Sequence, residues 1–224
     1  KFTLSVQTMI GAGMGIASRS PDPDTYEHAN DFCDVMVIGS GPAGIAAAQE
    51  AADKKLDVIL VEQDSVIGGD KLSDADFDSK NLRSSLISSG VKIMTRTTAF
   101  GLYDNCVAGL LERVTDHTNI KPEYLPRQRF WTIRAKHIII GTGAFERHIA
   151  FNNNDVPGVM NANAAKHYLN RYGVLSGQNI TLATNNDSVY GTALELAQAG
   201  SNVSIIDSRF SVGNEITEEL SKNN

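Results

Sequence analysis

The sequence is poor in cysteine, and the two cysteines that it has form no motif. Cys33 and Cys106 are far apart and belong to no CxxC pair. A redox-active dithiol or a thiolate zinc site needs closely spaced cysteines, and a disulfide framework needs more of them. The sequence therefore argues against all three, and it fits a reducing, cytosolic setting.

Other features typical of particular partners are also scarce. The chain has 20 Lys and Arg residues against 26 Asp and Glu, a net charge of −6, and no basic stripe, so no nucleic-acid partner is expected. No stretch long enough to span a bilayer is free of charges and helix breakers, so no membrane partner is expected either. No catalytic residue and no metal site are predicted, because no local motif suggests a nucleophile and a base and because metal-ligand spacing is missing from the five histidines, which are His28, His117, His137, His148 and His167.

What the sequence does contain is a strand, a glycine loop, a helix and a second strand across residues 34–62. The apolar strand 35–38 runs into Gly39-Ser40-Gly41-Pro42-Ala43-Gly44, and the strand 58–61 ends on Glu62. Gly39 permits a tight turn, Gly41 lets the backbone approach a pyrophosphate, and Gly44 lets the helix pack closely on the strand. The helix N-terminus offers N–H groups to the phosphates, and the Glu62 carboxylate can accept hydrogen bonds from the ribose hydroxyls. A lone GxGxxG also fits a plain tight turn, but the order of these parts predicts a nucleotide site.

The next segment predicts a third parallel strand and then a change of rhythm. Gly68-Gly69-Asp70 forms a loop beside the same strand ends, where ligands of open α/β sheets bind. A short helix is predicted at 81–89, a parallel strand at 91–95, and an antiparallel meander of strands at 99–103, 107–114 and 129–133. A buried strand at 137–140 then ends in Gly141-Thr142-Gly143. This second glycine bend would either approach the same pyrophosphate or form a plain strand-end turn.

A second strand–helix–strand pattern begins at residues 179–184. In its turn only Gly191 matches the fingerprint, because Asn186 and Ser188 stand at the first two glycine positions. Side chains there would crowd a pyrophosphate, and Asp187 would repel it or simply cap the following helix. The strand 203–206 ends on Asp207, and a helix at 215–222 is followed by no further strand. We therefore expect a disabled phosphate loop in a truncated unit.

These patterns predict four segments. They are an N-terminal extension (1–30), a first dinucleotide-binding domain with the meander (31–150), a connector with a helical stretch near 162–172 (151–178), and a partial second unit with a degenerate phosphate loop (179–224). The opening residues make a poor signal peptide, and Gly11 to Gly15 indicates a flexible turn rather than a phosphate loop. Because the chain begins at Lys1 rather than Met, we expect that an upstream portion is missing.

One competent and one defective nucleotide unit, with a meander between them, resembles the α/β, Rossmann-like FAD/NAD(P)-binding fold of the glutathione reductase type. The match is closer over PDPDTYEH before Cys33, over RFWTIRAKHIIIGTGAFERHIAFNNNDVPGVMNANAAKHYLNRYGV and over TNNDSVYGTALELAQAG. These runs resemble the α subunits of heterotetrameric sarcosine oxidases. Related α subunits serve opine oxidase, hydrogen cyanide synthase and proline dehydrogenase complexes, but TNNDS and FERHIAFNNNDVPG favour the sarcosine branch.

The resemblance implies a subunit of a flavin-dependent oxidoreductase complex in one-carbon metabolism. Such a complex converts sarcosine to glycine, with formaldehyde or methylene-tetrahydrofolate and hydrogen peroxide. It implies β, γ and δ partner subunits, FAD in the β subunit, FMN at the α–β interface, and tetrahydrofolate bound only by a domain absent from this chain. In the α subunit it implies a tightly bound NAD that is not turned over, although FAD presents the same ADP moiety to the glycine loop. The matching contacts are Gly39, Gly41, Pro42, Ala43, Gly44, Glu62, Gly69, Thr142 and Gly143, with the backbone of Ala99 as a weaker candidate for the adenine edge.

Two other readings stay open. The first is a stand-alone FAD- and NAD(P)H-dependent oxidoreductase, which the Asn186/Ser188 turn disfavours because hydride delivery needs a second dinucleotide site. The second is a fragment that binds an adenine nucleotide for stability only. Arg147, just past the second glycine bend, could meet a phosphate, although a solvated strand-end arginine is the preferred interpretation. Asp70 and Lys71 are expected to be solvated loop charges.

Overall fold

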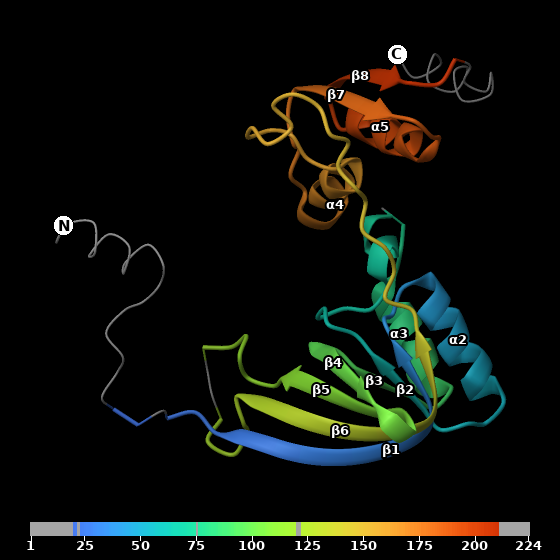
Figure 1. Cartoon of the computed structure of the whole chain (residues 1–224), viewed down its shortest axis with the longest axis vertical. Helices are drawn as coiled ribbons and strands as arrows, with labels where there is room; N and C mark the ends of the chain where they lie inside the picture. The colour runs from blue at the N-terminus through green and yellow to red at the C-terminus, as the bar shows by residue number, and fades with distance from the viewer. Residues whose placement is uncertain (1–19, 22, 75, 120–121, 211–224) are drawn as a thin grey trace.

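The computed structural model describes residues 20–21, 23–74, 76–119 and 122–210. Two features predicted from the sequence, the glycine turn at 11–15 and the helix at 215–222, lie outside the described residues. Figure 1 shows two lobes that are linked along the chain by the irregular segment 141–161 and contact each other through α4 (Ala162–Tyr172) of the smaller lobe. The larger lobe contains a six-stranded sheet, and the smaller lobe contains a two-stranded sheet.

The larger lobe is a mixed sheet with the strand order β3-β2-β1-β6-β5-β4. β3, β2, β1 and β6 run parallel, whereas β5 pairs antiparallel with β6 and β4 pairs antiparallel with β5. The predicted parallel unit with an inserted meander is therefore confirmed. The strands are β1 (Tyr26–Ile38), β2 (Val58–Val61), β3 (Val91–Met94), β4 (Thr97–Tyr103), β5 (Val107–Arg113) and β6 (Gln128–Ile140), and the helices are α2 (Pro42–Asp53), η1 (Gly69–Ser73), α3 (Ser79–Ser88) and η2 (Asp104–Cys106).

β1 and β6 are longer than the sequence predicts. β1 begins at Tyr26 and not at residue 35, and the strands predicted at 129–133 and 137–140 are one strand, β6. The two long strands pair side by side from Tyr26↔Gln128 to Ile38↔Ile140. Residues 26–30, assigned to an extension from the sequence, thus belong to the sheet.

A break in side-chain alternation explains why these strands looked short. In β1, Cys33 and Met36 lie in one apolar cluster and Val35 lies in the other, so the alternation fails at Asp34. β6 breaks at the facing residue, Lys136, whose Nζ lies 2.7 Å from Asp34 Oδ1. Since period-two alternation is the main sequence signal of a half-buried strand, a break in it looks like the end of a strand.

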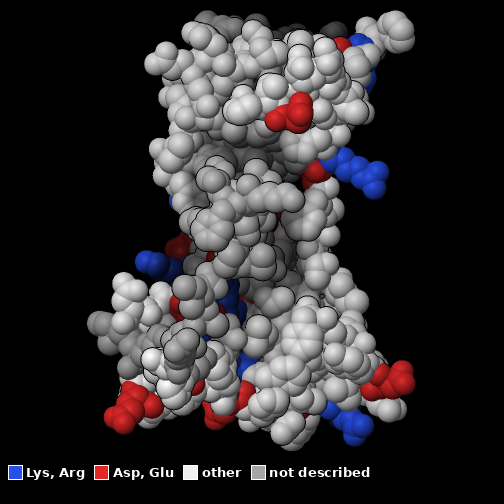
Figure 2. Space-filling view, turned by 60° about the vertical axis from the view of Figure 1, so that its left-hand side comes forward, with Lys and Arg blue, Asp and Glu red and all other residues white. Residues whose placement is uncertain are grey.

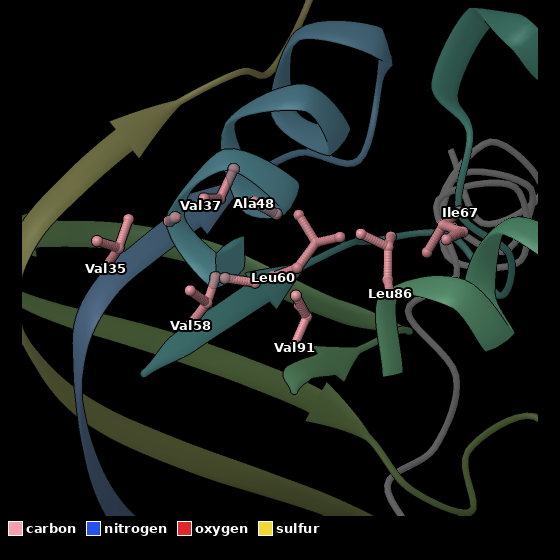
Figure 3. Packing of buried hydrophobic residues seen from close by; sticks show 10 residues of the cluster. Val35, Val37, Ala48, Val58, Leu60, Ile67, Leu86 and Val91 are labelled. Carbon is pink, nitrogen blue, oxygen red and sulfur yellow. The ribbon is translucent and has the colours of Figure 1, made fainter. Parts of the chain in front are cut away.

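The end of β1, residues 35–37, and the whole of β2 are buried on both faces. On one face they pack against α2 and α3, and Figure 3 labels eight members of that cluster: Val35, Val37, Ala48, Val58, Leu60, Ile67, Leu86 and Val91. On the other face Met36, Ile59 and Val61 pack against the meander through Leu110 and Ile133. Burial on two sides accounts for the uninterrupted apolar runs that mark these strands in the sequence.

The smaller lobe is a single parallel strand–helix–strand unit preceded by a helix. Its elements are α4 (Ala162–Tyr172), β7 (Asn179–Thr184), α5 (Ser188–Gln198) and β8 (Asn202–Asp207). Leu182, Val189 and Leu196 form its core, and Ala165 of α4 joins them. The second strand–helix–strand pattern predicted from the sequence is therefore present.

The surface carries charges of both signs. On the face shown in Figure 2, Lys and Arg lie singly among uncharged side chains, with Asp and Glu close by, and the molecule narrows between the two lobes. Within the part of the chain that the structure describes, no helix has the length and hydropathy to cross a membrane.

Candidate dinucleotide-binding site

Three glycine-containing segments meet at the carboxyl ends of β1, β2 and β6. The amide of Gly39 donates to Val61 O (2.8 Å), and the amide of Gly141 donates to Ile38 O (2.7 Å). The amide of Gly68 donates to the carbonyl oxygen of Ser40, which follows Gly39, at 3.0 Å. The second glycine bend predicted from the sequence therefore lies against the first loop, at the sheet edge where open α/β folds bind ligands.

Close backbone contact explains two of the glycines. Gly39 has a φ of +97°, and a Cβ on it would lie 2.3 Å from the Gly141 carbonyl oxygen. A Cβ on Gly44 would lie 1.9 Å from the Gly39 carbonyl oxygen, whereas the nearest strand atom, Val37 Cγ1, is 3.4 Å away. The sequence assigned Gly44 to packing on the strand, but the tightest contact is with the glycine loop itself.

The N-terminus of α2 is open. Gly41 precedes the helix, and a Cβ on Gly41 would meet nothing within 4 Å. Pro42 is the first helical residue, Ala43 is exposed, and the helix has neither a side-chain cap nor an acidic residue in its first turn. By contrast, Asp78 caps α3 by accepting from two backbone amides. The N–H groups and positive dipole end of α2 thus lack a partner from a side-chain cap, which suits an anionic ligand.

Glu62 is held in place at the end of β2. Its side chain is buried, and Oε2 accepts hydrogen bonds from both the amide and the hydroxyl of Ser40. Oε1 accepts from the amide of Asp64 at 2.8 Å. A carboxylate has about four acceptor positions, so about one remains on Oε1 for a ribose hydroxyl. Sequence reasoning missed Ser40 and Asp64, although the position of Ser40 between two glycines and opposite the acid was a usable signal.

The remaining predicted residues lie around this loop. Gly69 packs beside Gly41, since a Cβ on Gly69 would lie 2.8 Å from Gly41 Cα. Thr142 and Gly143 are exposed just after β6. Ala99, on β4, and Thr142 line the same pocket of about 250 Å³. The other residues that line this pocket are Ile38, Phe100, Gly101, Leu102 and Ile140. Ala99 and Thr142 are thus brought together, whereas Glu62 and the first glycine loop do not line that pocket.

A residue that sequence reasoning did not identify reaches this region from the smaller lobe. The Arg171 guanidinium, in the last turn of α4, makes two contacts with the Asp64 carboxylate: Nη1 to Oδ2 at 2.6 Å and Nη2 to Oδ1 at 2.8 Å. This guanidinium is the main reason that the pKa of Asp64 is lowered to about 2. No local sequence pattern predicts this ion pair, because Asp64 and Arg171 are 107 residues apart in the chain.

Other polar contacts dock α4 against η1 and the residues around it. Lys166 Nζ lies 3.0 Å from Asp74 Oδ1 and 3.2 Å from Glu195 Oε1. His167 Nδ1 lies 2.7 Å from the hydroxyl of Ser73. Arg147 lies in an exposed segment, in agreement with the preferred interpretation of a solvated arginine. Asp70 is exposed, and Lys71 pairs with Asp74 at 2.8 Å.

In the second unit, the groups that would face a dinucleotide are satisfied by the chain's own side chains. Asn186 Oδ1 accepts from the amide of Ser188 at 2.9 Å and from its hydroxyl at 2.6 Å. Asp187 was considered from the sequence as a helix cap, but it makes no cap and instead pairs with Arg209 at 2.7 Å. Arg209 also binds Asp207 at the end of β8, which lowers the pKa of that carboxyl.

Within residues 20–210, apart from the positions that the structure leaves out, no group of three or more His, Cys, Asp or Glu side chains could hold a metal ion. Both cysteines are free. Cys33 is buried, and burial is the main reason that its pKa is raised to about 11. Cys106 is exposed, so the two thiols lie in different surroundings.

Comparison with known proteins adds relatives to this geometry. The profile of the pyridine nucleotide-disulphide oxidoreductase family matches residues 33–223. Sarcosine oxidase subunit alpha from Rhizobium meliloti (strain 1021) is 45% identical over 215 residues, and the protein of that name from Corynebacterium sp. (strain U-96) is 37% identical over 222 residues. These matches cover 90% and 92% of this chain but only 22% and 23% of the relatives. The resemblance inferred from the sequence is thus confirmed.

A solved structure resembles the chain over a similar span. The crystal structure of L-proline dehydrogenase from P. horikoshii matches with a TM-score of 0.64 and 26% identity, over 86% of this chain and 38% of that one. The family profile, the sequence relatives and this solved structure all match the part of the chain that contains the glycine loop, the parallel strands and the meander. This chain therefore belongs to the pyridine nucleotide-disulphide oxidoreductase family, whose fold implies binding of FAD or NAD(P).

Proposed function

We propose that the first lobe holds an adenine dinucleotide, with NAD as the preferred ligand and FAD as the alternative in the same site. The observation that carries this proposal is the open N-terminus of α2 facing free space at Gly41, with a fixed carboxylate, Glu62, at the end of the neighbouring strand. A pyrophosphate suits the first feature and a ribose diol suits the second. The residues present therefore fit the ligand.

In this proposal each predicted residue has a role in binding, and none is catalytic. Gly39 and Gly44 shape the loop, whereas Gly41, Pro42 and Ala43 border the pyrophosphate. Glu62 accepts from the adenosine ribose. The more distant contacts are Gly69, Ala99, Thr142 and Gly143, with the backbone of Ala99 at the adenine edge. When bound, the dinucleotide supplies a redox-active ring, while the chain supplies position and orientation. We assign this site to the domain 31–150 and no dinucleotide to the unit 179–224.

We further propose that the chain is the dinucleotide-binding part of the α subunit of a sarcosine oxidase-type complex in the cytoplasm. Two relatives with that name, each matched over nine tenths of this chain, support the proposal. In this complex the β subunit brings the FAD that oxidises sarcosine, FMN lies at the α–β interface, and γ and δ subunits complete a heterotetramer. Tetrahydrofolate would accept the one-carbon unit on a different domain.

A second candidate is the α subunit of a proline dehydrogenase-type complex, which the 26% identity and TM-score of 0.64 to L-proline dehydrogenase favour. A stand-alone NAD(P)H-dependent reductase is less well supported. Its second dinucleotide would need the turn at 185–191, where Asn186 and Ser188 bond each other and Arg209 occupies the carboxylates of Asp187 and Asp207. These groups would have to separate before a phosphate could enter.

The ligand can be identified directly. We expect the purified protein to release NAD on denaturation, detected by mass spectrometry, and nucleotide-depleted protein to bind NAD more tightly than NADP. The reason is that the Glu62 carboxylate accepts from a free 2′-hydroxyl and repels a 2′-phosphate. Released FAD would select the alternative ligand. A preference for NADP, or the absence of any adenine nucleotide together with no binding in titration, would contradict the proposal.

The division of labour among subunits can be tested by activity. We expect the α subunit alone to produce no hydrogen peroxide from sarcosine, and the complex formed with a β subunit that carries FAD to do so. Flavin bleaching under anaerobic sarcosine provides a second readout, and proline in place of sarcosine tests the second candidate. Turnover of sarcosine by the isolated subunit, or oxidation of NADH with a bound flavin, would transfer the catalytic flavin to this chain.

A further inference from the structure

The Arg171–Asp64 ion pair joins the smaller lobe to the loop that follows β2. Both nitrogens of the guanidinium fork contact the two carboxylate oxygens, at 2.6 and 2.8 Å. The side chains retain only 21% and 31% of their accessible surface, so the pair is largely screened from water. Paired, charge-assisted hydrogen bonds of this kind fix orientation as well as position. The fork, together with the amide and hydroxyl of Ser65, which donate to Asp64 Oδ1, therefore fixes how the Asp64 side chain lies.

The backbone of Asp64 passes this constraint to the ribose-binding carboxylate. Its amide donates to Glu62 Oε1 at 2.8 Å, and its carbonyl accepts from the amide of Arg96 at 2.7 Å. The other Glu62 oxygen is held independently by Ser40. Oε1 is the oxygen with a free acceptor position, so its direction depends on Asp64 and, through Asp64, on Arg171.

The same pair also controls the charge beside the ribose. Arg171 and Glu62 both contact Asp64, so the guanidinium lies near the ribose-binding carboxylate. In dinucleotide sites, a nearby arginine is the usual means of accommodating a 2′-phosphate. Here that cation is neutralised by Asp64, which leaves the carboxylate of Glu62 to repel a second phosphate.

We propose that Arg171 and Asp64 act as one positioning and specificity pair for the adenosine ribose. Arg171 holds the Asp64 loop so that Glu62 faces a 2′-hydroxyl, and Asp64 keeps Arg171 from receiving a 2′-phosphate. This inference rests on the proposed function, because it assumes that the ribose lies at Glu62. It makes affinity for the nucleotide depend on a helix of the other lobe.

The test compares two ligands that carry only the shared ADP moiety, ADP-ribose and 2′-phospho-ADP-ribose, by calorimetry on nucleotide-depleted protein. Arg171→Ala should weaken ADP-ribose binding by about tenfold, because Asp64, whose amide orients Glu62 Oε1, then loses its two-point contact with the guanidinium. Arg171→Lys should recover part of the loss, since it restores the charge without the fork. Asp64→Asn keeps the shape, frees Arg171, and should narrow the preference for ADP-ribose over the 2′-phosphate by about tenfold.

Lys166→Ala provides the matched control. Lys166 lies on the same helix and pairs with Asp74 of the larger lobe and with Glu195 of its own lobe, and neither partner belongs to residues 62–65. Its ADP-ribose affinity should stay within about twofold of the wild type. If Arg171→Ala and Lys166→Ala lose the same amount of ADP-ribose affinity, the ion pair only holds the two lobes together and the inference is wrong. An unchanged preference between the two ligands in Asp64→Asn would also overturn the inference.

Failure of the underlying function gives a different result. If the wild-type protein binds neither ligand, the proposed nucleotide site itself is wrong. If it binds ADP-ribose and the Arg171 and Asp64 variants do the same with unchanged constants, only the inference fails. Circular dichroism checks folding, and if Arg171→Ala does not fold, the Arg171→Lys and Asp64→Asn arms decide the question.

Discussion

Replacing Gly44 by Ala is expected to destabilise the larger lobe severely. The new Cβ would lie 1.9 Å from the Gly39 carbonyl oxygen, and the atom it meets belongs to the backbone, so no side-chain rotation relieves the overlap. Either the N-terminus of α2 or the glycine loop must move away from β1. We expect a loss of about 3 kcal/mol or more in the free energy of unfolding. Thermal denaturation of the ligand-free protein should show a midpoint lowered by roughly 10 °C.

The second unit offers a matched control for this substitution. Gly191 occupies the third fingerprint position in α5, and a Cβ on it would meet nothing within 4 Å. Gly191→Ala should therefore leave the melting temperature unchanged or raise it, because alanine is favoured over glycine inside a helix by up to about 1 kcal/mol. If both variants melt at the wild-type temperature, the close approach at Gly44 does not exist in the folded protein.

Replacing Gly41 by Val should have the opposite pattern, with folding intact and nucleotide binding lost. Gly41 has φ −69° and ψ 178°, an extended conformation that valine adopts readily, and its Cβ would project into free space. That space lies in front of the open end of α2, where the pyrophosphate is proposed to bind. We expect affinity for NAD to fall by about 100-fold or more, because the branched side chain removes the close approach of the phosphates.

Two measurements separate this effect from a folding defect. The melting temperature of ligand-free Gly41→Val should match that of the ligand-free wild type, while mass spectrometry should find no adenine nucleotide in the purified variant. Gly41→Ala, with a single methyl group, should retain part of the affinity. A Gly41→Val protein that carries one nucleotide per chain would show that the phosphates take another path.

The local parts of this site could be predicted from the sequence because each leaves a local pattern. Gly39, Gly44 and Glu62 follow from the spacing of a strand, a loop and a helix within about thirty residues. The Arg171–Asp64 pair has no such pattern, since its partners lie in different lobes and their meeting depends on how α4 docks. The lengths of β1 and β6 were missed for a different reason: the paired break at Asp34 and Lys136 erases the alternation that marks one continuous strand.

The pairing of β1 with β6 also has a consequence for folding. β1 lies between β2, which follows it closely in the chain, and β6, which is synthesised about a hundred residues later and must close a large loop before pairing. The Gly39 turn gains its neighbour Gly141 only in that last step. Many contacts in the larger lobe therefore join residues that are far apart in the sequence, which favours slow folding. One edge of β1 also stays unpaired on the ribosome until β6 has emerged.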